Sequence, residues 1–412
     1  MREPYPLRPV TEAEFAPWAR MIADTYGADR CEQELTGQRA ATDLDRTLAA
    51  FDSGTPIAGA SIYRRALTVP GAVLPVAGIA SVGVAPTHRR RGILTSIMRR
   101  QFTELHEQRR EPVAVLRPSE AGIYGRYGYG PATRGDQIRC LRRSMVFRDG
   151  VDSGCGQVRL CHREQARARI EEVYERASAA TVGWPRRTGA HWDVRLFDQP
   201  QARGAASTLR FALHHEPDGE VSGYVLYRHA VDPDASAVVQ VVELAAVSRQ
   251  AHAALWRFLA GIDLVRWIDC EVAVDDPLPH LLVDPRAVVS APVDRLWVRL
   301  VDVDRALGAR RYAVPLDVVL EVTDRFCPWN EGRYRLRAGT DGVACTRTED
   351  PADLRMSSAE LAAAFLGGTR LASLGAAGLV EERSPGALRL TSAAFAWDRE
   401  PFYPGGWAFP LY

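Results

Sequence analysis

Residues 81–98, SVGVAPTHRRRGILTSIM, are the part of the sequence that decides the fold. Val82 and Val84 alternate with small residues as in a strand, and Pro86 ends that strand because it cannot donate a backbone hydrogen bond. An apolar-periodic segment follows the basic run and predicts a helix, which we expect Thr87 to cap. A strand, a basic turn and the start of a helix are thus joined within one short stretch.

The turn in this stretch has the features of an anion-binding site. The first amides of a helix point free N–H groups into one space, and the helix dipole favours negative charge there. Gly92 lets a phosphate approach the backbone closely, while Arg89, Arg90 and Arg91 supply positive charge. This combination suits a pyrophosphate, although neither a P-loop nor a G-x-G-x-x-G pattern is present. The alternative is an exposed basic helix start that binds no ligand.

The elements around this stretch alternate between helix and strand. Pro70 and Gly71 fit the two central positions of a type II turn, which predicts a hairpin. The expected elements of the first third are a helix over 12–23, a strand over 56–64, a hairpin over 66–84, a helix to about residue 110 and a buried strand over 112–116.

Two further units are expected after the first. The short polar block 151–156, VDSGCG, has the composition of a linker. Strands over 223–229 and 238–246 and a helix over 248–259 then repeat the first unit in outline. A third unit begins with the alternating run at Leu296 and contains a helix over 357–367 with a serine cap. The expected domains are therefore 1–150, 151–295 and 296–412.

Composition limits the function classes. The 412 residues are 46% hydrophobic and 25% charged, and 52 basic against 51 acidic residues leave a net charge of +1, which gives no case for nucleic acid as a partner. No apolar segment fits a signal peptide or a membrane span, so we expect a cytoplasmic protein. Seven cysteines without a C-x-x-C pair, and His214-His215 without ligands at suitable spacing, argue against a metal site.

A second motif follows the strand over 112–116. It is residues 119–133, SEAGIYGRYGYGPAT. The pattern V-x-V-x-P-x-x-R-R-R-G-x-L resembles the acetyl-CoA motif of the GNAT acetyltransferases, although Leu94 departs from the small residue usual there. Tyr124 and Tyr129 fit Y-x-x-x-G-[F/Y], the fourth motif of that family.

The GNAT resemblance implies roles for individual residues. In that fold the two strands that end near Val84 and Leu116 splay apart, and the acetyl thioester lies in the opening. Tyr124 would act as general acid toward the departing thiolate. Its alternative role is packing in an aromatic cluster with Tyr127 and Tyr129. The acetyl-CoA-binding residues that the resemblance implies are Val82, Val84, Arg89, Arg90, Gly92 and Ser119.

With residues 324–336, DRFCPWNEGRYRL, the sequence is similar over nearly its whole length to the Eis (enhanced intracellular survival) family of aminoglycoside N-acetyltransferases. This resemblance implies an α/β chain with two tandem GNAT-like domains, the second without cofactor, and a sterol-carrier-like third domain. It also implies homohexamers that transfer acetyl from acetyl-CoA to amines of polycationic aminoglycosides, often at several positions.

The same resemblance extends to the acceptor side. The carboxylate of the last residue, Tyr412, would orient the acceptor amine and take its proton. Asp24 is a candidate acceptor-site carboxylate, with a solvated helix face as the alternative, and Ser81 would leave room for a bulky acceptor. Two other functions stay open: a GNAT enzyme that acetylates a protein lysine or a natural-product amine, and a non-catalytic protein that binds acyl-CoA or lipid.

Overall fold

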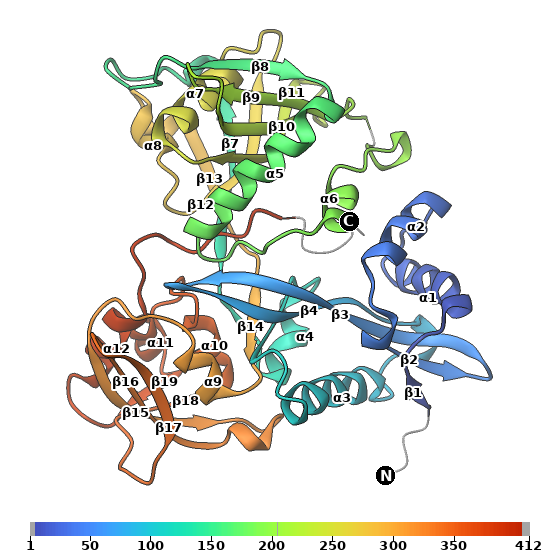
Figure 1. The fold of residues 1–412 in the computed structure, drawn as a ribbon, viewed down its shortest axis with the longest axis vertical. Helices are drawn as coiled ribbons and strands as arrows, with labels where there is room; N and C mark the ends of the chain where they lie inside the picture. The colour runs from blue at the N-terminus through green and yellow to red at the C-terminus, as the bar shows by residue number, and fades with distance from the viewer. Residues whose placement is uncertain (1–4, 204, 406–412) are drawn as a thin grey trace.

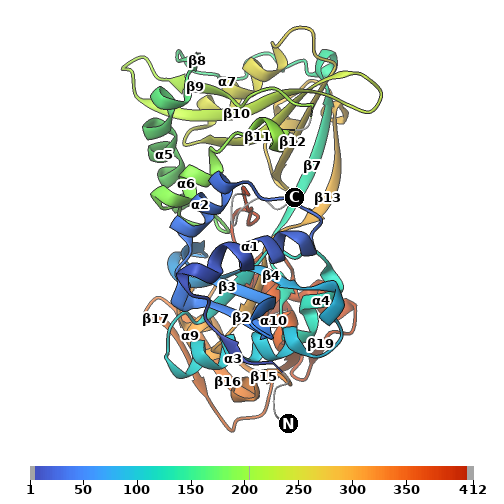
Figure 2. The same cartoon turned by 90° about the vertical axis from the view of Figure 1, so that its right-hand side faces the viewer.

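Three sheets organise the chain, and helices flank each of them (Figure 1). The structure is a computed structural model and describes residues 5–203 and 205–405. The middle sheet and its helices occupy one end of the long axis, while the first and third sheets share the other end (Figure 2).

The first sheet has the strand order β1-β2-β3-β4-β5-β14-β6. Its strands are β1 (Leu7–Arg8), β2 (Thr47–Asp52), β3 (Thr55–Val69), β4 (Ala72–Val84), β5 (Val113–Leu116), β14 (Trp297–Leu300) and β6 (Gly130–Pro131). Its helices are α1 (Glu12–Thr25), α2 (Glu32–Ala41), α3 (Ile93–Glu107) and α4 (Ala121–Tyr124).

Helices cover both faces of this sheet. On one face, Met98 and Phe102 of α3 pack with Ile79 of β4. On the other face α1 lies so close to β3 that a Cβ atom at Gly59 would come within 2.0 Å of the Trp18 indole nitrogen. Both faces of the sheet are therefore covered by helices.

The second sheet has the strand order β13-β7-β12-β11-β10-β9-β8. Its strands are β7 (Arg134–Leu141), β8 (Gln157–Cys161), β9 (Arg210–His215), β10 (Val221–Val231), β11 (Ala237–Ala246), β12 (Trp267–Ala273) and β13 (Val288–Asp294). Its helices are α5 (Arg163–Ala180), α6 (Gly189–Arg195), α7 (Arg249–Ala260) and α8 (Leu278–Leu281). Both views place α6 beside α2 of the first domain (Figures 1 and 2), and Ala41 and Val194 both pack against the buried residues Tyr63 and Ala80.

The third sheet has the strand order β17-β16-β15-β18-β19. Its strands are β15 (Leu316–Thr323), β16 (Gly332–Gly339), β17 (Gly342–Arg347), β18 (Leu354–Ser357) and β19 (Val380–Glu382), and its helices are α9 (Val303–Gly308), α10 (Ser358–Ala364), α11 (Leu371–Ala376) and α12 (Ala387–Phe395). Its core is continuous with that of the first domain, because Leu67 and Val76 of the first sheet belong to the same cluster of buried residues as Leu320 and Phe365.

Two strands lie in a different sheet from the one that the expected domain boundaries imply. β7 precedes residue 150, yet it pairs with β12 and β13 in the second sheet. β14 follows Leu296, where we expected the third unit to begin, yet it pairs antiparallel with β5 and β6 in the first sheet. The second sheet therefore takes β7 from the first expected unit, the first sheet takes β14 from the start of the third, and the third domain follows from α9 onward.

Most of the expected elements are present. α1, the hairpin of β3 and β4, and α7 lie where the periodicity predicted them. Gly71 has φ +67° in the hairpin turn, and Ser357 caps α10 in a capping box with Glu360. Within the described part of the chain, no helix is both long and apolar enough to cross a membrane.

Candidate functional site

The pairing between β4 and β5 ends before either strand does. The two strands run parallel and are in register only at Ala77 with Ala114 and Gly78 with Val115. β4 continues beyond Gly78 to Val84 and stays paired with β3 on its other side. Among the described strands, none pairs with the β5-facing edge of this last part of β4, so no neighbouring strand occupies that edge.

A bulge distorts β4 at this point. The register with β3 shifts between Gly59 and Ser61, and Ser81 has φ +52°, an uncommon conformation for a residue other than glycine. Gln38 of α2 donates a hydrogen bond to the Ser81 hydroxyl at 3.4 Å. The Tyr26 hydroxyl, at the end of α1, donates to the Val82 carbonyl. Helices α1 and α2 thus close one side of the strand end.

The basic turn lies directly after β4. Residues 86–88 form a short 3-10 helix, and Thr87 bonds the neighbouring His88 ring at 2.8 Å. The prediction that Thr87 caps α3 is therefore wrong: Gly92 is the N-cap, with φ +80°. A Cβ atom at Gly92 would meet no other atom within 4 Å, so the space beside the first turn of α3 is open. This opening fits the close backbone approach expected of a phosphate.

The three arginines of the turn are exposed and differ in their contacts. Arg89 bonds backbone carbonyls of Val84 and Thr25 at 3.3 and 3.4 Å. Arg91 bonds the Tyr5 hydroxyl at 2.7 Å. Among the described residues, none of the three forms an ion pair with a carboxylate, so their charge is not neutralised within that part of the chain. The turn therefore attracts anions.

Tyr124 ends the short helix α4 and is buried. Its ring meets that of Tyr129 edge to face at 6.0 Å, and the Tyr127 hydroxyl lies 3.3 Å from the Thr95 hydroxyl of α3. Burial raises the pKa of Tyr129 well above its usual value near 10, although Arg299 opposes this effect. The aromatic cluster is thus present, and the role of the Tyr124 hydroxyl as general acid stays a prediction.

The other candidate residues lie around these elements. Ser119 is exposed in the loop between β5 and α4, and Asp24 is exposed in the last turn of α1, beside the residues that contact β4. Tyr412 lies outside the described residues. The described end of the chain contacts the second domain. The Phe402 amide donates to the Val182 carbonyl at 2.9 Å, and Arg187 donates to the Gly405 carbonyl at 3.0 Å.

A buried charge cluster lies where the second domain meets this tail. Arg187 pairs with both carboxylate oxygens of Glu243, at 2.9 and 2.7 Å, and Arg195 bonds the same carboxylate at 3.0 Å. Burial alone would raise the pKa of Glu243, but the two guanidinium groups lower it to about 2. The cluster is therefore fully ionised and holds α6 in place beneath the tail.

Sequence reasoning missed Tyr26, Gln38 and this cluster. Tyr26 lies three residues after the predicted helix over 12–23, and this position was the only available signal for it. In the described part of the chain, no group of three or more metal-binding side chains lies close enough to hold an ion. His214 is a core residue whose ring bonds the Ser222 hydroxyl at 2.8 Å.

Comparisons with known proteins identify each part of the chain. Models of the acetyltransferase (GNAT) domain match residues 6–132 and 183–300, and a model of the sterol carrier protein domain matches residues 303–404. The N-acetyltransferase Eis of Mycobacterium tuberculosis is 40% identical over 381 residues, which cover 89% of this chain and 90% of that protein. This chain belongs to the Eis family of N-acetyltransferases.

Two further relatives match over nearly their full length. An N-acetyltransferase of Streptomyces avermitilis is 41% identical and covers 97% of this chain and 99% of its own length. The crystal structure of Eis1 from Mycobacterium abscessus superposes with a TM-score of 0.84 at 34% identity and covers 97% and 99% of the two chains. The expected fold, two GNAT domains followed by a sterol-carrier-like domain, is confirmed, and the chain is an N-acetyltransferase.

Proposed function

We propose that this Eis-family enzyme transfers acetyl groups from acetyl-CoA to amino groups of aminoglycoside-type polyamines, at several positions, within a ternary complex. The observation that carries the proposal is the strand end itself. β4 loses its β5 partner after Gly78, and the exposed arginine turn and the open first turn of α3 follow directly. An extended ligand with a pyrophosphate matches both parts of this arrangement. The unpaired end of β4 can hydrogen-bond the extended part, and the arginine turn can bind the pyrophosphate.

The chain's own residues would divide the work as follows. Val82 and Val84 offer their backbone amides to the pantetheine arm, because their carbonyls already accept from Tyr26 and Arg89. The turn from Arg89 to Gly92 binds the pyrophosphate, with Ser119 on the opposite loop. Acetyl-CoA supplies an acetyl group activated as a thioester. Tyr124 donates its phenolic proton to the sulfur as the carbon–sulfur bond breaks, a contribution of about 10²–10⁴-fold.

The attacking amine must lose a proton as its nitrogen bonds the acetyl carbon. We assign this proton to the C-terminal carboxylate of Tyr412, which accepts it directly or through a water molecule. Asp24 and Ser81 complete the proposed acceptor side. The described tail supports this assignment, because Arg187 and Val182 bind it up to Gly405, next to the interface between the first two domains.

One assay tests the proposal. The purified protein is incubated with acetyl-CoA and a panel of aminoglycosides, polyamines and lysine peptides, and each acceptor is analysed by mass spectrometry. We expect acetylated aminoglycosides with more than one acetyl group. Acetylation of lysine peptides alone would favour a protein acetyltransferase, and acetyl-CoA binding without any transfer would favour a binding protein.

A single substitution tests the general acid. Tyr124→Phe keeps the ring contact with Tyr129 and removes only the proton donor, so kcat should fall by about 10²–10⁴-fold while the Kd for acetyl-CoA is unchanged. Steady-state kinetics with tobramycin and calorimetry with acetyl-CoA measure the two quantities. Wild-type kcat in Tyr124→Phe would leave this residue with a packing role alone.

The proposed assembly is a homohexamer. Light scattering on the eluting peak of a sizing column measures the mass of the assembly. A mass of six chains is expected, and a monomer would contradict it.

A further inference from the structure

The segment that follows Tyr124 rests on the third domain. The Tyr127 ring meets the ring of Phe326, from the loop after β15, at 4.9 Å and 63°. At Gly130 a Cβ atom would come within 2.1 Å of the Ala359 carbonyl oxygen in α10. A backbone contact this close leaves no room for a side chain, so the segment and α10 fit together directly.

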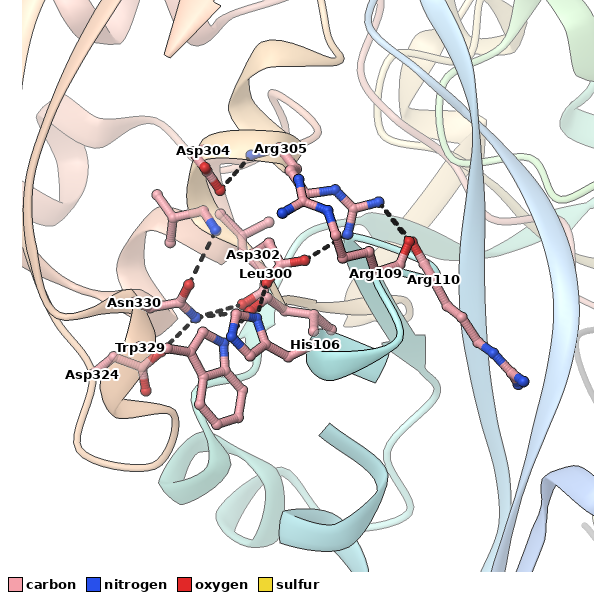
Figure 3. Close-up of polar contacts among 12 residues, drawn as sticks. His106, Arg109, Arg110, Leu300, Asp302, Asp304, Arg305, Asp324, Trp329 and Asn330 are labelled. Atoms are coloured by element: carbon pink, nitrogen blue, oxygen red, sulfur yellow. Dashed lines mark hydrogen bonds and ion pairs between the residues drawn. The ribbon is translucent and has the colours of Figure 1, made fainter. Parts of the chain in front are cut away.

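A buried ion pair holds the loop that carries Phe326. Arg299 of β14 pairs with Asp324 at 2.5 Å, and both side chains are almost completely buried. Asn330 donates from its side-chain amide to Asp324 at 3.1 Å and to the Leu300 and Val301 carbonyls at 3.2 and 3.0 Å (Figure 3). The loop from Asp324 to Asn330 is therefore fixed to a strand of the first sheet.

The same ion pair reaches the segment after Tyr124. A Cβ atom at Gly128 would come within 2.2 Å of an Arg299 guanidinium nitrogen and 2.8 Å of the Ser358 hydroxyl oxygen. Gly128 itself has φ +82°, so the chain turns there over the guanidinium group. Arg299 thus fills the space beneath the turn, and Asp324 of the third domain neutralises it.

Ring contacts continue from Phe326 to Tyr124. Phe326 meets Phe102 of α3 at 6.0 Å, Phe102 meets Tyr129 at 5.9 Å, and Tyr129 meets Tyr124 at 6.0 Å. The Phe326 ring therefore contacts the Tyr124 segment both through Tyr127 and through this chain of rings. Contacts of this kind fix ring orientation, because aromatic pairs favour defined geometries.

We propose that Phe326 of the sterol-carrier-like domain is a positioning residue for Tyr124. The inference rests on the proposed function, in which Tyr124 donates a proton to the leaving sulfur. A proton donor must keep its geometry closely, and a displacement of about 1 Å costs up to about 10²-fold in rate. Contacts with Phe326 and α10 of the third domain keep the segment 124–130 in that geometry.

The same interface offers a matched control. Trp329 lies on the same loop as Phe326, stacks on His106 of α3 at 4.5 Å and 13°, and donates to the Val301 carbonyl at 2.9 Å (Figure 3). None of these contacts involves the segment 124–130. Phe326→Ala and Trp329→Ala therefore each remove one half-buried aromatic ring from the interface. Among the ring contacts of the described residues, Phe326 meets Tyr127 and Trp329 meets His106.

Two measurements on the full chain test the proposal. Steady-state kinetics use acetyl-CoA and tobramycin over a range of pH, and hydrogen exchange followed by mass spectrometry reports on residues 121–131. Phe326→Ala should lower kcat by about 10–10²-fold, shift the alkaline limb of the kcat profile and speed amide exchange in that segment, with an unchanged Kd for acetyl-CoA. Phe326→Tyr, which keeps the ring, should show the wild-type kcat, pH profile and amide exchange. Trp329→Ala should keep kcat within about twofold at a similar loss of thermal stability.

The outcomes separate this inference from the proposed function. Wild-type kcat and exchange in Phe326→Ala, beside an impaired Tyr124→Phe, would overturn the positioning role alone. Equal losses in Phe326→Ala and Trp329→Ala would also overturn it, because the interface would then act only through stability. An active Tyr124→Phe would overturn the general acid and this role together. If Phe326→Ala does not fold, Phe326→Leu takes its place with the same expected results.

Discussion

Replacing Gly92 with valine has two effects that the structure allows us to separate. Gly92 caps α3 at φ +80°, so a valine there costs about 1–2 kcal/mol of backbone strain with or without a ligand. Packing adds nothing to this cost, because a Cβ atom meets nothing within 4 Å. The side chain instead enters the open space that we assign to the pyrophosphate. We expect acetyl-CoA affinity to fall at least about tenfold, equivalent to about 1.4 kcal/mol.

Gly386 provides the matched control. It caps α12 at φ +87°, and a Cβ atom there also meets nothing within 4 Å. Gly386→Val therefore introduces the same strain in the third domain without touching the basic turn. Calorimetry with acetyl-CoA and a thermal melt of each variant measure the two effects, and both melts should move by a few degrees. A folded Gly92→Val protein with wild-type affinity, or an equal loss of affinity in both variants, would refute the assignment.

Three further predictions concern the second domain and the tail. Calorimetry should find one acetyl-CoA per chain, because the Ser248 side chain already accepts from the first turn of α7 at 3.1 Å and no arginine cluster adjoins it; two per chain would contradict this. Deleting 411–412, or adding a short C-terminal tag, should abolish acetyl transfer but keep acetyl-CoA binding, and a fully active tagged enzyme would rule out the Tyr412 carboxylate. Burial and the charges of Arg65 and Arg187 lower the pKa of His191 to about 3, so its contribution to stability is complete above pH ~6.5 and lost as the pH falls toward 3. Denaturant titrations should show about 1–2 kcal/mol of this loss by pH 5.5 in the wild type and not in His191→Phe, and equal pH dependence in both would contradict it.

Local patterns predicted most of the elements but not their partners. The alternating run from Leu296 correctly predicts a strand, and nothing in it says that this strand joins β5 of the first sheet. Strand pairing over such a separation is decided by which apolar faces can be buried together, and a periodicity carries no such information. The position of β7 in the second sheet was missed for the same reason.

The site was predictable where one segment carries the chemistry. The strand, the arginines and Gly92 lie within 81–98 and could be recognised together. Thr87 is a preferred cap residue by type, yet a separate 3-10 turn takes it away from the helix start. The contacts of Tyr26 with Val82 and of Phe326 with Tyr127 join distant segments, so only the folded chain brings them together.

The position of β14 in the first sheet also affects how the chain folds during synthesis on the ribosome. β14 leaves the ribosome about 180 residues after β5, which is roughly 10–35 s of synthesis at 5–20 residues per second. During that interval β5 has no neighbour on one side, and an unpaired apolar strand edge invites aggregation. The acetyltransferase domain therefore cannot complete its folding before the second domain has been translated, and a shortened chain that ends near residue 150 should misfold.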